Sequence, residues 1–443
     1  SFDERVMVFA ATLCLLTGCL CSLAPAWRTR KMSLTPALSR RIGAVRSRGI
    51  PWGASLVVLQ VAASLVVLAG SGLFVRTLWN LRNENLGFAR QHLLLVWTTP
   101  GDVRGTGVLR ANLWHAAQDR LAALPGVRTV AAADGGLLNG IDRGGDSERM
   151  KVEGQPPRPG MRVRWMVVTS RFFETAGIPL IAGRDFTERD AQTSARVTII
   201  NETMARFYFG RENPIGKHLG KPADAGYPWE IVGVVGDTKT GTPRSDSSKF
   251  IVQYFPYRQD TNNLGNMCLV VRTDGVPTSV APRVRQALAD IEPLLPVTRI
   301  DTVDEQLDDV VSRERLMATL SALLGALAAL LACLGLYGLM TYTVARRTQE
   351  IGLRMALGAT RSQVARHVLR YSAGLVVVGV AIGVPLALAG TRLVAAQLFG
   401  VGPGDPLTVT SATVLTVVLG VLAGIVPLYR ASRVDPLIAL RGE

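Results

Sequence analysis

Residues 316–340 read LMATLSALLGALAALLACLGLYGLM and contain no charged side chain. A helix needs about 20 apolar residues to cross the roughly 30 Å hydrocarbon core of a bilayer, and this run is long enough. Helices of soluble proteins rarely continue this far without a charged residue on an outer face. The run therefore predicts a membrane-spanning helix rather than a buried helix of a soluble protein.

Four other stretches have the same character, with no Asp, Glu, Lys or Arg in their central part: 6–24, 54–74, 373–389 with an extension to 395, and 409–428. Hydrophobic residues make up 48% of the chain, which agrees with a protein that is partly solvated by lipid. We therefore expect about five transmembrane helices.

The formal net charge of +15 lies mainly in short connectors. The long segment 76–315 holds 31 Lys and Arg against 28 Asp and Glu, a net charge of only +3. The connectors at 25–50 and 341–372 and the tail after 428 are strongly basic. Short basic loops stay on the cytoplasmic side, so we predict that 76–315 is extracytoplasmic. No nucleic-acid partner is expected, because the basic residues do not gather on a folded domain.

Cysteine placement agrees with this topology. The predicted membrane helices contain Cys14, Cys19, Cys21 and Cys333, and the exported segment contains only Cys268. One cysteine cannot form an internal disulfide, so we expect the exported domain to be stable through its hydrophobic core alone.

The exported segment has a mixed α/β rhythm. We predict strands at 92–99, 127–133, 162–169, 196–200, 229–235, 250–257, 267–272 and near 297–300. Helices are predicted at 108–124, 170–176, 201–209 and 277–291. The Gly- and Pro-rich stretch 134–160 is too long for a simple connector, and the shorter stretch 237–249 has a similar composition.

Two helices are expected to leave the membrane as a stalk. The second membrane helix continues without a breaker to Leu81. Thr302 and Glu305 have the spacing of a capping box that begins the returning helix. We predict one continuous helix from Thr302 to Met340. Such a rod could transmit motion between the exported domain and the membrane or could simply tether the domain, and the sequence leaves both readings open.

Patterns for catalysis are not evident. The stretch GRENPIGK at 210–217 has five residues between its glycines and a histidine after its lysine, so it departs from the P-loop pattern. The four histidines lack metal-ligand spacing. We predict no catalytic residue, no cofactor, no metal and no enzyme activity in this chain.

The predicted membrane helices instead offer close-packing surfaces. Gly379 and Gly383 are four residues apart, as are Gly420 and Gly424. Small residues at this spacing let two helices approach closely in a bilayer. We predict that these four glycines are helix-packing positions.

The two ends of the chain echo each other. The first predicted helix is followed by Pro25, Ala26, Trp27 and Arg28, and the last by Pro427, Leu428, Tyr429 and Arg430. Both then lead into a short segment that begins with proline. We interpret residues 1–48 as the tail of an earlier copy and predict that the natural protein continues upstream with another exported domain. Chance similarity of two basic helix ends is the alternative.

The most specific stretch is the connector between the third and fourth predicted helices. It contains Glu350, Ile351, Gly352, Leu353, Arg354, Ala356, Leu357, Gly358 and Ala359, followed by a basic amphipathic helix at 360–369. A basic helix of this kind could lie flat on anionic lipid. The whole pattern closely resembles the signature of the MacB/FtsX superfamily of ABC transporter permeases (type VII). In that family this loop contacts the ATPase subunit, which implies an ATPase-coupling role for 350–359.

The resemblance extends over nearly the whole chain. Residues 316–443 look like the FtsX-type membrane domain, and 80–300 look like the MacB-type periplasmic core, with matching motifs at 172–179, 183–186, 200–202 and 214–217. The plan resembles the C-terminal half of the orphan duplicated permeases of that family, which carry no ATPase. The resemblance implies a membrane α-helical bundle plus an α/β MacB-type periplasmic core domain on a helical stalk, in the bacterial inner membrane.

On this basis we divide the chain into five parts: 1–24, the last transmembrane helix of a preceding repeat; 25–50, a basic cytoplasmic linker; 51–83, a transmembrane helix and stalk; 84–300, the periplasmic core domain; and 301–443, a membrane domain with three helices. The resemblance implies a permease that couples a cytoplasmic ABC ATPase subunit to motion of the periplasmic domain. Its expected partners are that ATPase, a second permease repeat or protomer, the lipid bilayer and a periplasmic partner. The alternative function is a non-transporting envelope sensor or scaffold.

Overall fold

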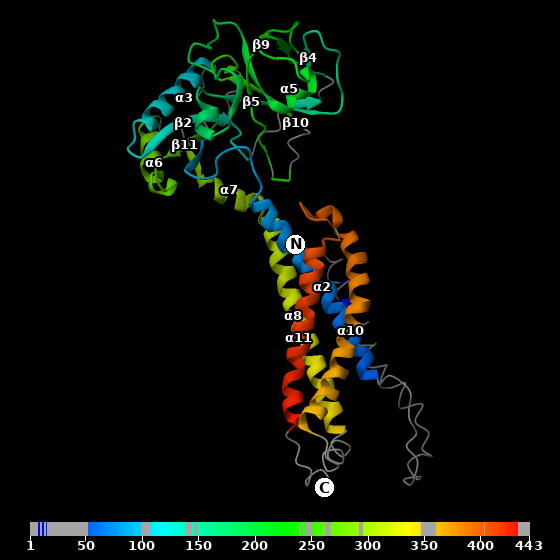
Figure 1. The fold of residues 1–443 in the computed structure, drawn as a ribbon. Coiled ribbons are helices and arrows are strands. Elements are labelled where there is room, and N and C mark those ends of the chain that lie inside the picture. The colour runs from blue at the N-terminus through cyan, green and yellow to red at the C-terminus, as the bar shows by residue number, and fades with distance from the viewer. Residues whose placement is uncertain are drawn as a thin grey trace, which may run out of the picture. The chain divides into compact units, whose positions relative to one another are not determined.

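The computed structural model describes residues 8, 11, 12 and 15 and most of the range 52–432. Within that range it leaves out 99–106, 139–143, 147–148, 240, 242, 245–249, 262–266, 292–295, 347–359 and 403. The chain divides into two compact units, Ser1–Trp52 and Gly53–Glu443. Of the first unit, the predicted linker at 25–50 and most of the predicted helix at 6–24 lie outside the described residues. The second unit holds a helical bundle and an α/β domain (Figure 1).

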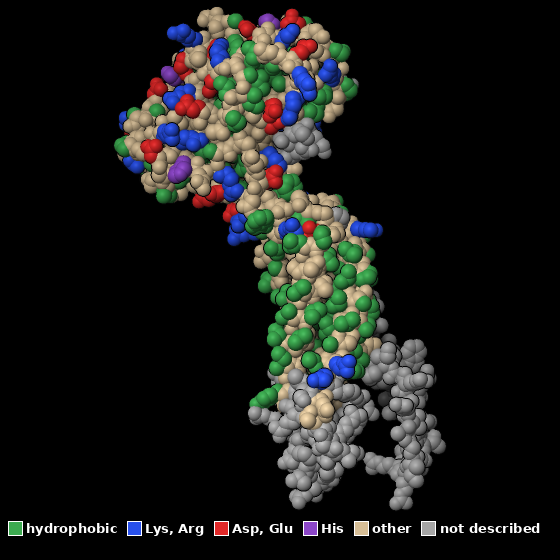
Figure 2. Space-filling view, in the orientation of Figure 1, with side chains coloured by type: hydrophobic (Ala, Val, Ile, Leu, Met, Phe, Trp, Pro, Cys, Tyr) green, Lys and Arg blue, Asp and Glu red, His purple; other side chains and the backbone are tan. Residues whose placement is uncertain are grey.

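Among the described residues, four long helices form the bundle: α2 (Trp52–Arg82), α8 (Ser312–Arg346), α10 (Arg361–Leu393) and α11 (Pro406–Ser432). Each is long and apolar enough to cross a membrane. They coincide with the predicted membrane helices at 54–74, 316–340, 373–395 and 409–428. Hydrophobic side chains cover most of the bundle face seen in Figure 2, as expected of helices that contact lipid.

The described residues of the α/β domain form a twelve-stranded mixed sheet with the order β12-β1-β11-β2-β5-β10-β7-β9-β8-β4, while β3 pairs with β5 and β6 pairs with β9. Eight strands correspond to the predicted ones: β1 (Leu93–Thr98), β2 (Val127–Asp134), β5 (Arg162–Val168), β7 (Val197–Asn201), β9 (Trp229–Val235), β10 (Phe250–Pro256), β11 (Met267–Thr273) and β12 (Val297–Thr302). Most neighbours are antiparallel, but β5 runs parallel to β10, and β7 runs parallel to β9.

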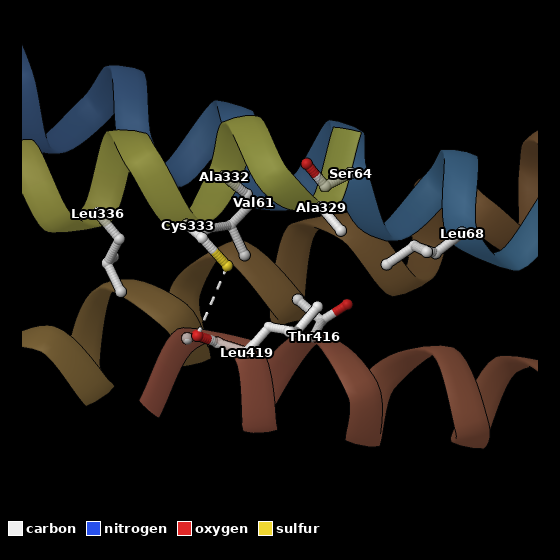
Figure 3. Close-up of a pocket in the computed structure, with 10 residues that line it drawn as sticks. Val61, Ser64, Leu68, Ala329, Ala332, Cys333, Leu336, Thr416 and Leu419 are labelled. Carbon is white, nitrogen blue, oxygen red and sulfur yellow. Dashed lines mark hydrogen bonds between the residues drawn. The ribbon is translucent and has the colours of Figure 1, made fainter. Parts of the chain in front are cut away.

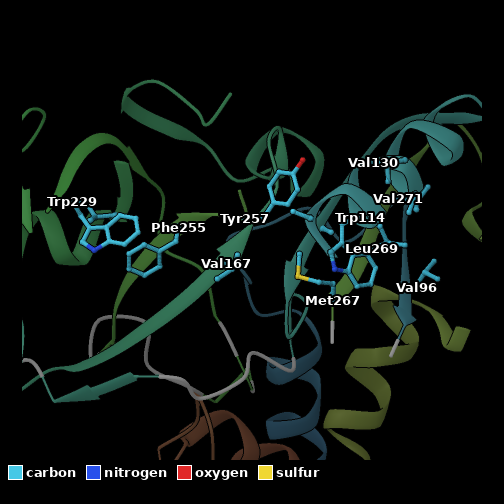
Figure 4. Close-up of a cluster of buried hydrophobic side chains, with 14 of the residues drawn as sticks. Val96, Trp114, Val130, Val167, Trp229, Phe255, Tyr257, Met267, Leu269 and Val271 are labelled. Atoms are coloured by element: carbon cyan, nitrogen blue, oxygen red, sulfur yellow. The ribbon is translucent and has the colours of Figure 1, made fainter. Parts of the chain in front are cut away.

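Helices cover both faces of this sheet. One core contains residues of α3 (Gly107–Ala122), α5 (Glu202–Phe209) and α6 (Ala281–Ile291), and the fully buried Trp114 of α3 belongs to it. Figure 4 shows Trp114 packed beside strand residues such as Met267 and Leu269. The opposite core contains residues of α4 (Phe172–Ala176) and α7 (Val303–Val310). Alternation along β10 explains the two cores, because Phe255 points into the first and Tyr254 into the second.

Short elements in this domain escaped prediction. They are β3 (Gly144–Asp146), β4 (Lys151–Val152), β6 (Leu180–Gly183) and β8 (His218–Gly220). Strands of two to four residues are too short to show a period of two in the sequence. The predicted helix at 277–291 is also divided, into the single 3₁₀ turn η5 (Pro277–Ser279) and α6.

The helix predicted to run unbroken from Thr302 to Met340 is interrupted. The Thr302 hydroxyl accepts a hydrogen bond from the Glu305 N–H at 3.2 Å, so the predicted capping box is confirmed. However, α7 ends at Val310, and Val311 leaves helical geometry (φ −96°, ψ 13°) before α8 begins. Two consecutive β-branched residues favour helix poorly, and the Val311 side chain is buried in the core of the α/β domain. The α/β domain thus reaches Val311, beyond residue 300 of the predicted range.

Candidate functional site

The predicted ATPase-coupling segment, Glu350 to Ala359, lies outside the described residues. The chain resumes at Thr360, whose N–H donates to the Gln363 side chain at 3.0 Å just before α10 begins. The basic segment 360–369 and the fourth membrane helix were predicted as separate helices. They form one helix of 33 residues, so the basic segment is continuous with a membrane helix.

Three of the four predicted packing glycines face a neighbouring helix at close range. A Cβ added at Gly379 would come within 2.7 Å of Val61, one at Gly383 within 2.9 Å of Leu65, and one at Gly420 within 2.7 Å of Val376. The first two pack α10 against α2, and the third packs α11 against α10. Gly424 has more room, because its nearest neighbour, the Ser372 hydroxyl oxygen, lies 3.5 Å from the added Cβ.

Hydroxyl groups and small residues also join α2 to α8. The Ser64 hydroxyl donates to the Ala328 carbonyl at 2.9 Å, and the Ser71 hydroxyl donates to the Ser321 carbonyl. A cavity of about 20 Å³ between α2, α8 and α11 is lined almost entirely by apolar atoms (Figure 3). It has room for about one water molecule. This cavity is therefore far too small to hold an exported solute.

The helix α2 belongs to both parts of the second unit. Its residue Leu65 is fully buried within the bundle, and Leu81, four to five turns further along, is buried in the core of the α/β domain. One continuous helix is therefore shared by the bundle and the α/β domain. The Arg82 guanidinium binds the Asp308 carboxylate at 2.5 Å and so ties the end of α2 to α7.

Loop residues of the α/β domain reach the bundle. The Lys239 ammonium binds Glu84 at 2.7 Å and lies 5.4 Å from the centre of the Phe399 ring, in the loop between α10 and α11. The Arg244 guanidinium binds Glu314 on α8 at 3.0 Å and donates to the Gln397 carbonyl at 2.8 Å. We define Glu84, Lys239, Arg244 and Glu314 as the junction residues.

Asp405 fixes the beginning of α11. Its carboxylate accepts hydrogen bonds from the Thr408 N–H at 2.9 Å and the Thr408 hydroxyl at 2.6 Å, and Pro406 occupies the first helical position. It also pairs with Arg76 on α2. The Thr408 hydroxyl hydrogen bond, with the Thr408 N–H and the Arg76 charge, holds the pKa of Asp405 below its ordinary value. The cap therefore stays ionised and binds α11 to α2.

Comparison with known families agrees with these two parts. The family model of the MacB-like periplasmic core domain matches residues 54–288, and that of the FtsX-like permease C-terminal domain matches residues 322–436. The chain belongs to the MacB/FtsX family of ABC transporter permeases. It is accordingly a membrane protein with an extracytoplasmic α/β domain, as predicted.

Some curated relatives of this permease are named as permeases alone, and others as combined ATP-binding/permease proteins. An ABC transporter permease of uncharacterized function, YknZ of Bacillus subtilis, is 26% identical over 62% of this chain and 69% of the relative. The pyoverdine export ATP-binding/permease protein PvdT of Pseudomonas syringae pv. tomato is 33% identical over 60% of this chain. The macrolide export ATP-binding/permease protein MacB of Mannheimia succiniciproducens is 24% identical over 62%. The match spans only 40% of that PvdT and 43% of that MacB.

Solved domains also align with the permease. The periplasmic region of MacB from Actinobacillus actinomycetemcomitans covers 52% of this chain and 97% of its own length, with 19% identity and a TM-score of 0.34. The extracellular domain of YknZ covers 47% of this chain and 98% of its own length, with 18% identity and a TM-score of 0.31.

Sequence reasoning missed the junction residues of the permease. Lys239 and Arg244 lie in the stretch 237–249, which the composition marked only as a loop. Their partners are far away in the sequence, and neither pair has a local pattern. Asp405 is different, because Asp before Pro at the start of an apolar run is a recognisable helix start.

Proposed function

We propose that this permease transmits force from a cytoplasmic ATPase to its extracytoplasmic domain, and that this motion drives export or another envelope function. The observation that carries the proposal is the double burial of α2, whose side chains Leu65 and Leu81 pack in the bundle and in the α/β domain, respectively. A second link runs through α7 and α8, which meet at Val311. The tight contacts of Gly379 and Gly383 with α2 would carry movement of α10 to that helix.

The ATPase would act through 350–359 and the basic start of α10. This assignment rests on the resemblance of that loop to the family signature. The names of PvdT and MacB include ATP-binding as well as permease, and the match to this chain covers less than half of each. We therefore infer that an ABC ATPase works with this chain.

A pull-down with tagged permease tests this role. The wild-type chain is expected to retain an ABC ATPase in detergent, and Glu350→Ala with Gly352→Leu is expected to lose it. Glu314→Gln serves as the matched control, because it removes one acid at the opposite end of the bundle. Equal retention by all three forms would refute coupling through this loop.

A second permease repeat or protomer is the other partner we propose. Eight leucines of α8 are exposed in this chain, and six of them recur at spacings of four and three: Leu316, Leu320, Leu323, Leu327, Leu330 and Leu334. This spacing of 3.5 residues is the heptad pattern by which two helices pack side by side. The face is suited to a helix of another copy within the bilayer.

A further inference from the structure

A cavity of about 270 Å³ lies where α2 and α8 meet the loops of the extracytoplasmic side. Its apolar lining comes from Phe74, Met317 and Ala396, and its polar lining from Thr77, Arg244, Arg313, Glu314 and Gln397. We propose that it binds the phosphate-bearing headgroup of an anionic phospholipid in the outer leaflet. The proposal does not depend on an ATPase.

The position of the cavity places it at headgroup level. Its lining residues lie near the extracytoplasmic end of α2, at the start of α8 and in the loop between α10 and α11. Trp79, on the next turn of α2, is 65% exposed, and Leu393 at the end of α10 is 88% exposed. Exposed tryptophan is typical of the membrane interface. An acyl chain can therefore leave the cavity along the apolar helix surface.

The charges of the lining favour an anion. Two arginines face one acid, Glu314, which already pairs with Arg244 at 3.0 Å. Among the described residues, no acidic side chain lies within ion-pair distance of Arg313, so no carboxylate neutralises the positive charge of its guanidinium. Guanidinium groups bind phosphate oxygens through two parallel hydrogen bonds. The lining as a whole thus combines a net positive polar side with an apolar side, which matches a phospholipid headgroup and the first carbons below it.

A bound lipid would touch both parts of the second unit. Arg244 belongs to a loop of the α/β domain, whereas Arg313 lies on α8. A phosphate shared between them would strengthen the junction that Arg244 and Glu314 already form. Anionic lipid would therefore stabilise the permease, and neutral lipid would not.

Native mass spectrometry and thermal unfolding of the purified full chain test the site. The probes are phosphatidylglycerol, phosphatidylcholine and inorganic phosphate, each added to the same detergent preparation. We expect phosphatidylglycerol alone to be retained and to raise the unfolding temperature. Arg313→Gln should weaken retention about fivefold, since one basic residue near an anionic lipid surface contributes about that factor.

Arg315→Gln is the matched control, because it removes the same charge two residues along α8 from a side chain that faces Asp308. It should retain phosphatidylglycerol as wild type does, while Arg244→Gln should reduce retention. Equal retention by Arg313→Gln and wild type would overturn the site. If Arg315→Gln loses as much phosphatidylglycerol as Arg313→Gln does, retention depends only on the overall positive charge of this region, and the specific site is wrong. If inorganic phosphate raises the unfolding temperature as much as phosphatidylglycerol does, the lipid assignment is wrong.

Discussion

Asp405 is a single residue that holds two elements together. It caps α11 through Thr408 and pairs with Arg76 of α2. We expect Asp405→Asn to keep the cap and lose the ion pair, and Asp405→Ala to lose both. The loss of an N-cap costs about 1 kcal/mol, so the alanine variant should unfold at a lower temperature than the asparagine variant. Thermal unfolding in detergent measures this order, and equal unfolding temperatures would contradict a capping role.

Asp185 gives the α/β domain a dependence on pH. Burial raises its pKa from the ordinary 3.8 to about 6, against the hydrogen bond donated by the Phe186 N–H. Between these two values the folded state binds more protons than the unfolded state. The free energy of unfolding contributed by Asp185 therefore falls as pH rises from about 4 to about 6, and the cost persists above pH 6.

Asp185→Asn should remove this cost. We expect Asp185→Asn to raise the free energy of unfolding by about 1 kcal/mol at pH 8, a modest value because solvent screens the partly exposed carboxylate. At pH 4 the free energy of unfolding should change little. Asp190→Asn is a control for which we expect an effect of opposite sign on stability. Although burial raises the pKa of Asp190, the hydrogen bonds from Arg184 and Thr187 outweigh it and hold the value below normal, so this variant should destabilise the domain at pH 8. Denaturant titrations of the full chain at both pH values measure the two effects.

Helix packing in the bundle can be tested with two glycines of one helix. A methyl group at Gly379 would meet Val61 at 2.7 Å, whereas at Gly374 nothing lies within 4 Å. Gly379→Ala should therefore cost about 1–3 kcal/mol through overpacking. Gly374→Ala should be neutral or slightly stabilising, because alanine favours helix. If thermal unfolding in detergent ranks the two variants in the opposite order, α10 does not pack against α2 as the structure places it.

Local patterns in the sequence predicted most elements of the second unit. The apolar runs predicted its four membrane helices, and alternating residues predicted eight strands. The Thr302–Glu305 spacing predicted the start of α7, because a capping box is a local signal. The interruption at Val311 was not foreseen, since it depends on where the Val311 side chain is buried. The pairing of β5 with β10, 82 or more residues apart along the chain, has no local signal either.

The candidate site was predictable only in part. The spacing of small residues pointed to Gly379, Gly383 and Gly420. The segment 350–359, to which family resemblance pointed, lies outside the described residues and stays a prediction. The junction residues and the lining of the interfacial cavity come from three or more segments brought together by the fold. Charged residues are common in loops and at helix ends, so the sequence around Arg244 and Arg313 did not distinguish them.

The pairing of this chain with a second repeat or protomer can be tested by cross-linking. In a background with Cys14, Cys19, Cys21 and Cys333 replaced by alanine, Leu327→Cys should form a dimer with mild oxidant, because Leu327 lies on the exposed leucine face of α8. Ala329→Cys is the control, since Ala329 lines the small cavity inside the bundle. Gel electrophoresis without reductant reads out the result. Equal cross-linking of both variants would argue against a specific α8 interface.

The central claim is that a cytoplasmic ATPase moves the extracytoplasmic domain through the helices. The most direct measurement is the distance between spin labels at Arg285→Cys on α6 and Leu393→Cys at the end of α10, both exposed. Cys14, Cys19, Cys21 and Cys333 would be replaced, while the buried Cys268 can remain because burial raises the pKa of its thiol. With the co-purified ATPase present, ATP is predicted to shift the distance distribution in the wild-type loop and not in Glu350→Ala with Gly352→Leu. An unchanged distribution with ATP, or the same shift in the loop variant, would contradict the account.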